Sequence, residues 1–238
     1  DVVFWNCIQE LGVNSIKGKW EWKCDDLQQL YKGDECKELA RNVLIYKSGI
    51  ATAYSKLIKT SYAQKHNIKH DARLKQGLEG TEFSLRVFYN ASNVLFLKEY
   101  YNHYRFNPDS ISKRVDEKNT GYVIDCLKVM VEDISAYPTD KEFTKALYQR
   151  AVYALIAISM NTYFHPANPD NALTASRKLA KVIKCNNICK TAIRETRLKD
   201  LDKQRRLALG LLKMRMYILL NPIAIVKHNL LNKSFYNK

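Results

Sequence analysis

Hydrophobic and polar residues alternate in the first third of the chain, and this two-residue period predicts strands. The run DVVFWNCI, residues 1–8, is rich in β-branched and aromatic side chains and predicts a buried strand. After the turn residues 12–15, the segment SIKGKWEWKC alternates again and places Trp20 and Trp22 on one face. We therefore expect a β-hairpin at the start of the chain.

Helical spacing then appears in two short segments. In GDECKELARNVLIY, residues 33–46, Asp34 is placed to cap a helix whose apolar face carries Leu39, Val43 and Leu44. A second short helix is expected at residues 79–91, followed by the strand NVLFL and the aromatic segment YYNHYRFNPDSIS. Both strands and helices are therefore expected in this part of the chain.

From residue 119 onward the pattern is helical. Thr139 and Glu142 form a capping box in front of the dense apolar segment 142–164, and a proline-containing loop follows it. Helical periodicity returns at 171–184 and continues from 187 to 220, where Asn221-Pro222 is expected to end the helix. We expect two regions, an α/β part at residues 1–118 and a mainly α-helical tail at residues 119–238.

The net charge of the chain indicates which kinds of binding partner to expect. The 238 residues include 39 Lys and Arg against 24 Asp and Glu, a net charge of +15, and residues 119–238 hold 20 of the basic residues but only 9 of the acidic ones. Such a surplus indicates an anionic partner, whether a phosphate-bearing substrate, nucleic acid or an anionic membrane. Nucleic acid is not expected, because no zinc module, RNA-binding signature or arginine-rich arm is present.

The six cysteines are scattered, which is typical of a reducing compartment and indicates a cytoplasmic location. The only close pair, Cys185 and Cys189, lacks the histidines of a zinc site, so no metal site is expected within this chain. No secretory signal is present, and no apolar run approaches the roughly 20 residues that span a bilayer. The chain opens at Asp1 directly into VVFW, as the interior of a longer protein would.

Three stretches occur in an order that points to one family. TAYSKLIKTSYAQKHNIKHD, residues 52–71, is similar to a segment with a Trp-x-Lys-Leu core followed by Asn-Ile. LEGTEFSLRVFYNASNVLFLKE is similar to a Glu-Asp-x-x-Phe helix with a strand behind it, and EYYNHYRFNPDSIS to an aromatic Tyr-Arg and Ser-Ile segment. Together, residues 1–112 resemble the acceptor-side half of inverting family 2 glycosyltransferases. The matching residues are Tyr54 in place of Trp, Lys56, Leu57, Asn67, Ile68, Glu79, Phe83, His103, Tyr104, Arg105, Ser110 and Ile111.

The resemblance implies a fold and a set of partners. The fold would be the C-terminal portion of a GT-A-like mixed sheet with flanking helices, followed by the helical tail. The family's donor-binding half, in which an Asp-x-Asp motif holds Mg²⁺ or Mn²⁺, does not match any part of this chain. Asp200-Leu201-Asp202 lies after the catalytic segments in a Lys/Arg-rich stretch and is not that motif. A divalent metal is therefore expected only in a full-length enzyme, with a nucleotide-sugar and a glycan or lipid-linked acceptor as substrates.

The resemblance also implies site residues. The family's catalytic base is the second acid of the Glu-Asp pair, and Gly80 stands there. The remaining candidates are Glu79 and Glu82, which face one side of a helix and are able to act as a pair. The alternative is that both are first-turn acids that stabilise the helix dipole.

Substrate binding is expected from four further residues. His103 and Arg105 would approach the diphosphate, and Tyr54 and Lys56 the donor or acceptor. The alternative is that these side chains are packed or solvated without a role in binding.

The tail supports a different function. Residues 205–233 contain six Lys or Arg and no acid, with Leu, Ile and Met at helical intervals. This pattern is typical of an interfacial helix on an anionic membrane, here the inner face of the cytoplasmic membrane, and also of a packed terminal helix with a basic outer face. The expected function is inverting transfer of a sugar. The alternative is a non-catalytic helical binding module, or an inactive relative, that associates with an anionic membrane or a partner enzyme.

Overall fold

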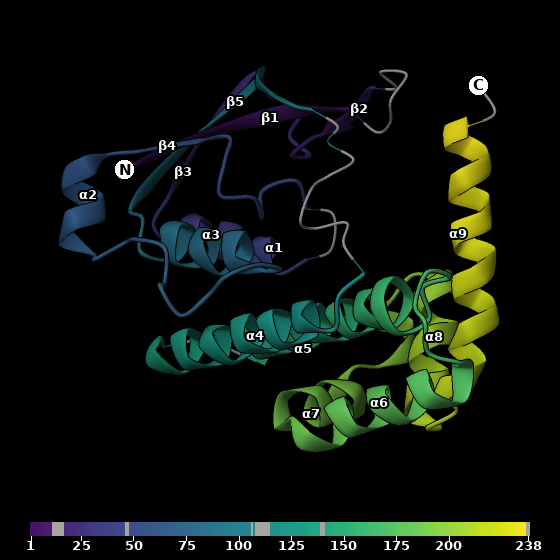
Figure 1. Cartoon of the computed structure of the whole chain (residues 1–238). Coiled ribbons are helices and arrows are strands. Elements are labelled where there is room, and N and C mark those ends of the chain that lie inside the picture. Colours follow the sequence, from purple (N-terminus) through teal and green to yellow (C-terminus); the bar gives the residue numbers. More distant parts are fainter. Residues whose placement is uncertain (11–16, 46–47, 106, 108–114, 139–140, 237–238) are drawn as a thin grey trace. The chain divides into compact units, whose positions relative to one another are not determined.

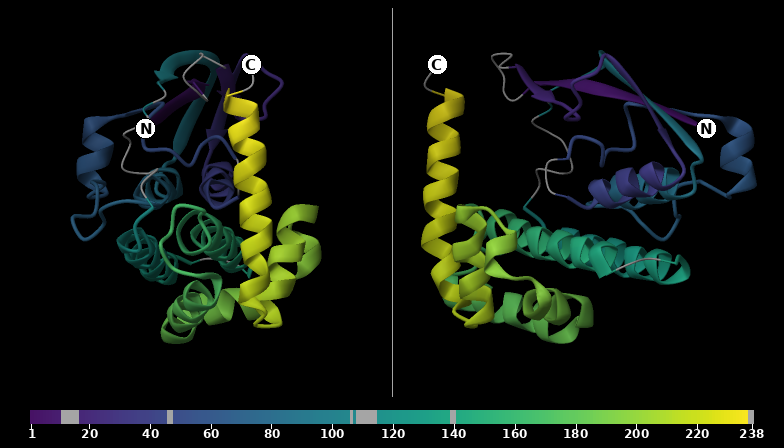
Figure 2. Two further views of the ribbon diagram at one scale, coloured as in Figure 1. Left: turned by 45° about the vertical axis from the view of Figure 1, so that its right-hand side comes forward. Right: turned by 180° about the vertical axis from the view of Figure 1, so that it is seen from behind.

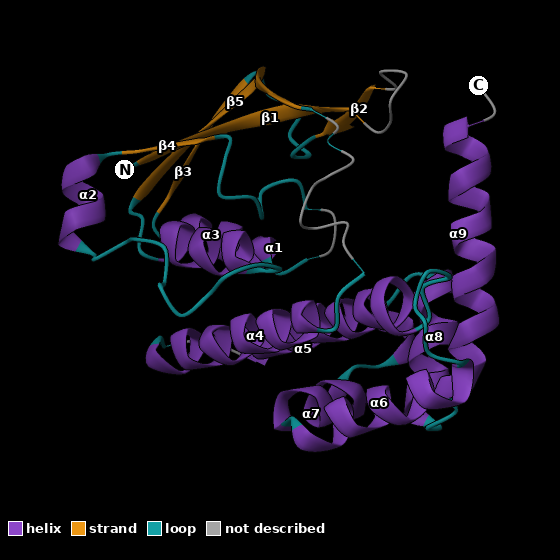
Figure 3. Cartoon of the chain, in the orientation of Figure 1, coloured by secondary structure: helices purple, strands orange, loops and turns teal. Residues whose placement is uncertain are grey.

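The computed structural model describes residues 1–10, 17–45, 48–105, 107, 115–138 and 141–236. The chain divides into two compact units, Asp1–Ser110 (unit 1) and Ile111–Lys238 (unit 2). Unit 1 combines a mixed sheet with helices, and the described residues of unit 2 form helices joined by loops and turns (Figures 1 and 3). The predicted α/β class is therefore confirmed, as is the change to helices in the second half of the chain.

The sheet of unit 1 is built around β1. Its strands are β1 (Val2–Glu10), β2 (Lys17–Trp20), β3 (Gln28–Lys32), β4 (Lys56–Ile58) and β5 (Asn93–Tyr104). Strand β1 runs parallel to β5, and β3 lies antiparallel on the outer edge of β5. Both β4 and β2 pair antiparallel with β1, β4 at its beginning and β2 at its end. The predicted first strand and hairpin are confirmed.

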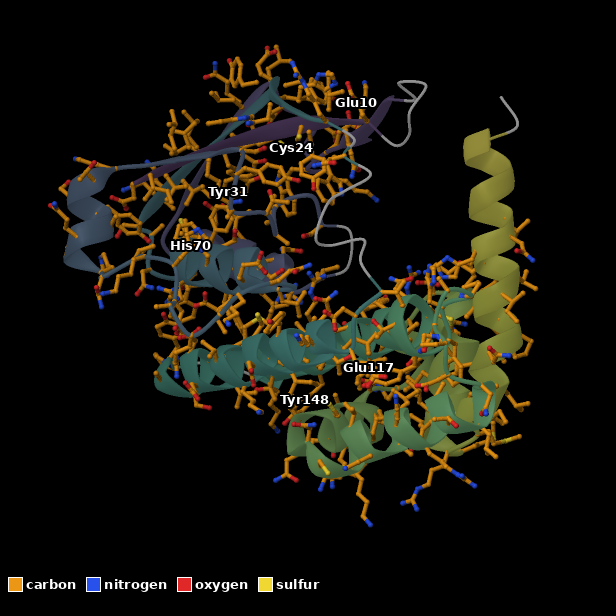
Figure 4. All side chains as sticks on the ribbon, viewed as in Figure 1. Glu10, Cys24, Tyr31, His70, Glu117 and Tyr148 are labelled. Carbon is orange, nitrogen blue, oxygen red and sulfur yellow. The ribbon has the colours of Figure 1, made fainter. Side chains whose placement is uncertain are left out.

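Two helices pack side by side on one face of this sheet. These are α1 (Asp34–Val43) and α3 (Glu79–Tyr89), which stay adjacent in both views of Figure 2, while α2 (Thr60–Lys65) lies at the edge. The core centres on Phe4 of β1, whose ring centroid lies 5.0 Å from that of Phe96 and 5.4 Å from that of Phe88. Tyr31 of β3 joins this core between the sheet and the helices (Figure 4).

Three predictions for unit 1 need correction. Strand β3 was not expected, because QQLYK is mostly polar and only Tyr31 is buried, with Leu30 half exposed. Asp34 is the first residue of α1 rather than its cap, which is Gly33 at φ 55°, and its carboxylate pairs with Lys37 at 2.7 Å. The aromatic run 100–104 continues β5, and the β1–β5 register shifts on either side of Asn6, as at a β-bulge.

Unit 2 is a set of short and medium helices. They are α4 (Lys118–Ala136), α5 (Lys141–Ile158), a π-helical turn (Ser159–Tyr163), α6 (Ala172–Cys185), α7 (Asn187–Glu195), α8 (Lys203–Lys213) and α9 (Leu220–Tyr236), with 3₁₀ turns at Leu198–Asp200 and Tyr217–Leu219. Of the predicted capping box, Thr139 lies outside the described residues. Among the described residues, no helix is long and apolar enough to cross a membrane.

The continuous helical stretch expected from 187 to 220 is divided into α7, α8 and two 3₁₀ turns. Asp202 begins α8 by accepting a hydrogen bond from the Arg205 backbone N–H, and both Asp200 and Asp202 pair with arginines, Arg197 and Arg205. The expected stop at Asn221-Pro222 is wrong as well. Pro222 lies in the first turn of α9, where its missing N–H has no helical partner to lose.

Helix α9 is attached to the π-helical turn through two polar contacts. The Nε2 of His228 lies 3.0 Å from the Met160 carbonyl oxygen, and Lys227 donates to the Asn161 side chain at 2.7 Å. The ring of His165 packs edge-on against that of His228, with centroids 4.3 Å apart. Burial lowers the pKa of His165, and the charges of His228 and Lys227 lower it further. His165 is therefore most compatible with this packing when neutral.

Acid should weaken unit 2 through His165. Because its pKa is lowered by folding, the neutral side chain contributes stability above the unfolded pKa of about 6.5, and this contribution is lost as pH falls through the folded value. The free energy of unfolding should fall less between about pH 7.5 and about pH 5 in His165→Asn than in the wild type. Urea unfolding followed by circular dichroism measures it. Asn keeps an acceptor for the Ala167 N–H, which His165 Nδ1 accepts at 3.0 Å. His66→Asn in unit 1 is the control, and an unchanged slope in His165→Asn would contradict the assignment.

Candidate functional site at residues 48–55

Residues 48–55, the crossing segment, connect α1 to β4 without regular secondary structure. Three contacts fix its backbone. The Lys56 amine donates to the carbonyl oxygens of Thr52 and of Ile50, the latter at 2.9 Å. The Ser84 hydroxyl also donates to the Thr52 carbonyl oxygen, at 2.9 Å. The backbone N–H of Trp5 donates to the Ser55 carbonyl oxygen, with an N···O distance of 3.2 Å. Ser55 has φ 63°, a left-handed conformation that costs a residue other than glycine about 1–3 kcal/mol. Such a conformation persists only where the surrounding contacts determine it.

Lys56 is half-buried, and its amine is directed toward the backbone of the crossing segment. Its Nζ lies 5.4 Å from the ring centroid of Phe88, which is fully buried, and burial lowers the pKa of Lys56 to about 7. Desolvation therefore outweighs the attraction of an ammonium to the ring. A neutral amine has two N–H groups, which matches the two carbonyl oxygens of Ile50 and Thr52. The predicted binding residue is a structural support of the crossing segment in this arrangement.

Two glycines allow the crossing segment to pass close to its neighbours. Gly49 has φ 82°, and a Cβ there would lie 2.6 Å from the Glu21 carbonyl oxygen. At Gly80, in the first turn of α3, a Cβ would lie 3.1 Å from Ala53 N and 3.6 Å from Ala51 O. The glycine at the position where the resemblance expects an acid thus has a structural reason. A side chain at position 80 would require the segment to move away by a few tenths of an ångström.

The two candidate carboxylates have different surroundings. Glu82 is only 1% exposed, and the Arg86 guanidinium binds both of its oxygens while also donating to Lys69 O at 2.7 Å. Glu82 is therefore one half of a buried ion pair. Glu79 is half-buried, and its Oε2 is buried without a hydrogen-bond partner in the described part of the chain. Of the two, Glu79 has the oxygen that is able to accept a proton.

An aromatic cluster lies at the other end of the crossing segment. The Tyr54 and Tyr104 rings stack at 5.6 Å with an interplanar angle of 24°, and Trp20 lies 6.2 Å from Tyr54 and 6.5 Å from Tyr104. Tyr104 is 41% exposed. The Tyr54 hydroxyl is buried without a partner among the described residues, and burial raises its pKa. The cluster therefore offers an aromatic face with an unsatisfied hydroxyl inside it.

The remaining predicted residues lie on and just after β5. His103 faces β1, with its Nε2 3.5 Å from the Glu10 carboxylate (Figure 4 labels Glu10). Arg105 is exposed directly after the strand. The strand pairing places Cys7 opposite Asn102 and Ile8 opposite His103, so β5 carries both His103 and Tyr104 to the end of the sheet where the aromatic cluster lies.

Sequence reasoning missed two residues of this region. Cys7 is buried, and burial raises the pKa of its thiol, while the adjacent Ser55 hydroxyl acts in the opposite direction. Ser55 is 6% exposed. Neither residue belongs to a motif, and no pattern in the sequence marks the left-handed turn that brings Ser55 to Cys7.

Unit 2 contains a separate open cleft of about 500 Å³ on α5 and α7, lined in part by Tyr148, which Figure 4 labels. Its charges largely pair with each other, Glu142 with Lys145 at 3.3 Å and Asp200 with Arg197 at 3.2 Å. These internal ion pairs leave the cleft without a clear charge preference. The crossing segment is the better candidate site.

Comparisons with known proteins do not assign the chain: no protein-family profile matches it, and no curated protein is significantly similar to it. Among the described residues, no group of three or more His, Cys, Asp or Glu side chains is placed to hold a metal ion. The case for a function therefore depends on the geometry around the crossing segment together with the sequence resemblance.

Gly80→Ala should destabilise unit 1 by about 1 kcal/mol or more, because its Cβ meets a backbone that Lys56 and Ser84 hold in place. The matched control is Gly121→Ala in α4, where a Cβ meets nothing within 4 Å and the change should raise stability by up to about 1 kcal/mol. All three tryptophans lie in unit 1, so urea unfolding by tryptophan fluorescence reports on Gly80→Ala and circular dichroism on Gly121→Ala. Equal effects of the two substitutions would show that the close contact at Gly80 is unimportant.

Proposed function

We propose that unit 1 is the acceptor-side half of an inverting glycosyltransferase-like domain, with Glu79 as its catalytic base. The observation that carries the proposal is the buried Glu79 Oε2 without a partner in the described structure, on the helix turn that packs against the crossing segment. Glu82, the other candidate, has both oxygens bound by Arg86. The sequence resemblance over residues 1–112 supports the same reaction class.

In this reaction Glu79 takes the proton of the acceptor hydroxyl while that oxygen bonds to the anomeric carbon of the donor sugar. The bond from that carbon to the nucleoside diphosphate breaks, and the leaving diphosphate keeps its electron pair. A general base of this kind contributes about 10²–10⁴-fold to the rate. Arg105 provides positive charge for the diphosphate, and the His103 ring, two residues before it, is able to donate a hydrogen bond to a phosphate oxygen. The donor-binding half and its divalent metal would belong to a longer enzyme.

The aromatic cluster is the proposed place for the acceptor. Sugar rings present C–H faces that pack on the electron-rich faces of aromatic rings, and Tyr104 is exposed enough to receive one. Tyr54 stacks on Tyr104, and its hydroxyl is buried without a partner among the described residues. Since Tyr54 follows Ala53, which lies against Gly80, the cluster and Glu79 are joined by one short segment.

A second candidate function is acceptor binding without catalysis. It is favoured by one observation: the position of the family's base is occupied by Gly80, and an acid there would require Ala53 to move away. A protein of this kind would retain the aromatic face and lose turnover. The two functions differ in whether Glu79 matters for the reaction.

Glu79→Gln should reduce sugar transfer by about 10²–10⁴-fold in the protein joined to its upstream donor-binding half, because the amide cannot accept the proton. Release of nucleoside diphosphate measures turnover, and nucleotide affinity should stay unchanged. Glu99→Gln, an exposed carboxylate on β5, is the matched control. Full turnover in Glu79→Gln would exclude this residue as the base, and absence of turnover in the wild type would favour acceptor binding alone.

Tyr104→Ala should weaken the binding of neutral oligosaccharides to the 238-residue chain by about tenfold, since one stacking face is lost. Titration followed by tryptophan fluorescence is a direct measurement, because Trp20 belongs to the cluster. Tyr101→Ala is the matched control: it is 64% exposed on the same strand but packs against Trp5, with centroids 5.6 Å apart. Equal losses in both variants would place the acceptor elsewhere.

A further inference from the structure

The turn between α8 and α9 exposes an unusual set of apolar side chains. Within residues 213–219, the basic–apolar turn, Met214 is 62% exposed, Met216 43%, and Ile218 and Leu219 41% each. Single exposed apolar residues are ordinary, but a contiguous group marks an interaction surface. Four such residues lie within six positions of one turn.

The turn is held in shape rather than free to fold its apolar residues inward. Arg215 N donates to Leu212 O at 3.2 Å and Met216 N to Leu211 O at 2.9 Å, the two bonds of a Schellman motif at the end of α8. Arg215 takes the left-handed position of that motif with φ 58°, where glycine is usual. Leu212 and Leu220, almost fully buried, anchor the turn at both sides.

The charges around the turn have one sign. Lys213 and Arg215 are exposed between the apolar residues, and residues 203–238 contain no Asp or Glu. Lys213 Nζ donates to Arg194 O at 3.0 Å, which leaves two of its three N–H groups for another acceptor. Basic groups alternating with exposed methionine, isoleucine and leucine match the boundary between anionic headgroups and acyl chains.

We propose that the basic–apolar turn docks on an anionic lipid surface. Met214, Met216, Ile218 and Leu219 enter the acyl boundary, while Arg215 and Lys213 bind headgroup phosphates. A nucleic acid would need the basic groups but would gain little from four aliphatic side chains between them, so the apolar residues favour a lipid partner. Helix α9 continues the same combination with Ile225, Val226 and Leu230, which are 40%, 57% and 63% exposed.

Deleting the tail is not a suitable test of this proposal. Helix α8 contributes Ala208, Leu209, Leu211 and Leu212 to the core of unit 2, and all four are buried. A truncation at residue 205 would therefore unfold the unit. Point substitutions in the exposed turn remove the docking groups while keeping this core.

The test is sedimentation of the 238-residue protein with vesicles of phosphatidylcholine alone and of about three parts phosphatidylcholine to one part phosphatidylserine. The protein should bind the anionic vesicles, and salt should weaken this binding. Arg215→Gly should reduce the affinity about fivefold, the effect of one basic residue near such a surface. Glycine suits the left-handed backbone at this position, so the fold should be preserved.

The double substitution Met214→Ser with Met216→Ser should reduce affinity for the anionic vesicles by roughly tenfold or more. Lys184→Ser and Leu173→Ser, exposed residues of α6, are the charge and apolar controls and should bind as the wild type does. Circular dichroism checks that each variant is folded. Absence of wild-type binding, or a loss in Arg215→Gly without a loss in the methionine double variant, would overturn the proposal.

Discussion

The Lys56 amine on the carbonyl oxygens of Ile50 and Thr52 is the contact on which the candidate site depends. The crossing segment has no strand or helix to satisfy its backbone, and buried carbonyl oxygens without donors are costly. The Lys56 amine supplies these donors from a buried position, where desolvation lowers its pKa to about 7. With the segment fixed, Tyr54 is held in the aromatic cluster and Ala53 is held against the start of α3.

The pattern of apolar and polar residues predicted strands and helices well where buried side chains recur at the period of a strand or of a helix. The strand at residues 2–10, the helix at 79–89 and helices α5 and α6 of unit 2 follow directly from the spacing of apolar residues. Prediction failed where tertiary contacts decide. Strand β3 is nearly all polar and forms because the edge of β5 offers backbone partners, and Pro222 is tolerated because it falls in a first helical turn.

The candidate site was predicted only in part, for a related reason. The sequence placed Glu79 and Glu82 on one side of a helix as the two candidate bases, but a pattern of acids does not show which one an arginine will bind. Arg86, one helical turn after Glu82, makes that distinction. The sequence resemblance led to the expectation that Lys56 contacts a substrate, and the spacing of residues does not show that its amine donates to carbonyl oxygens of the preceding segment.

Gly49 of the crossing segment and Gly80, which lies against it, should tolerate substitution to different degrees during evolution. At position 49 both the positive φ and the 2.6 Å approach to the Glu21 backbone exclude any side chain. At position 80 the backbone is an ordinary helix and only the distance to Ala53 is restrictive. Descendants of a common ancestor should thus keep glycine at 49, while an acid at 80 should be inherited together with an altered path for residues 51–53.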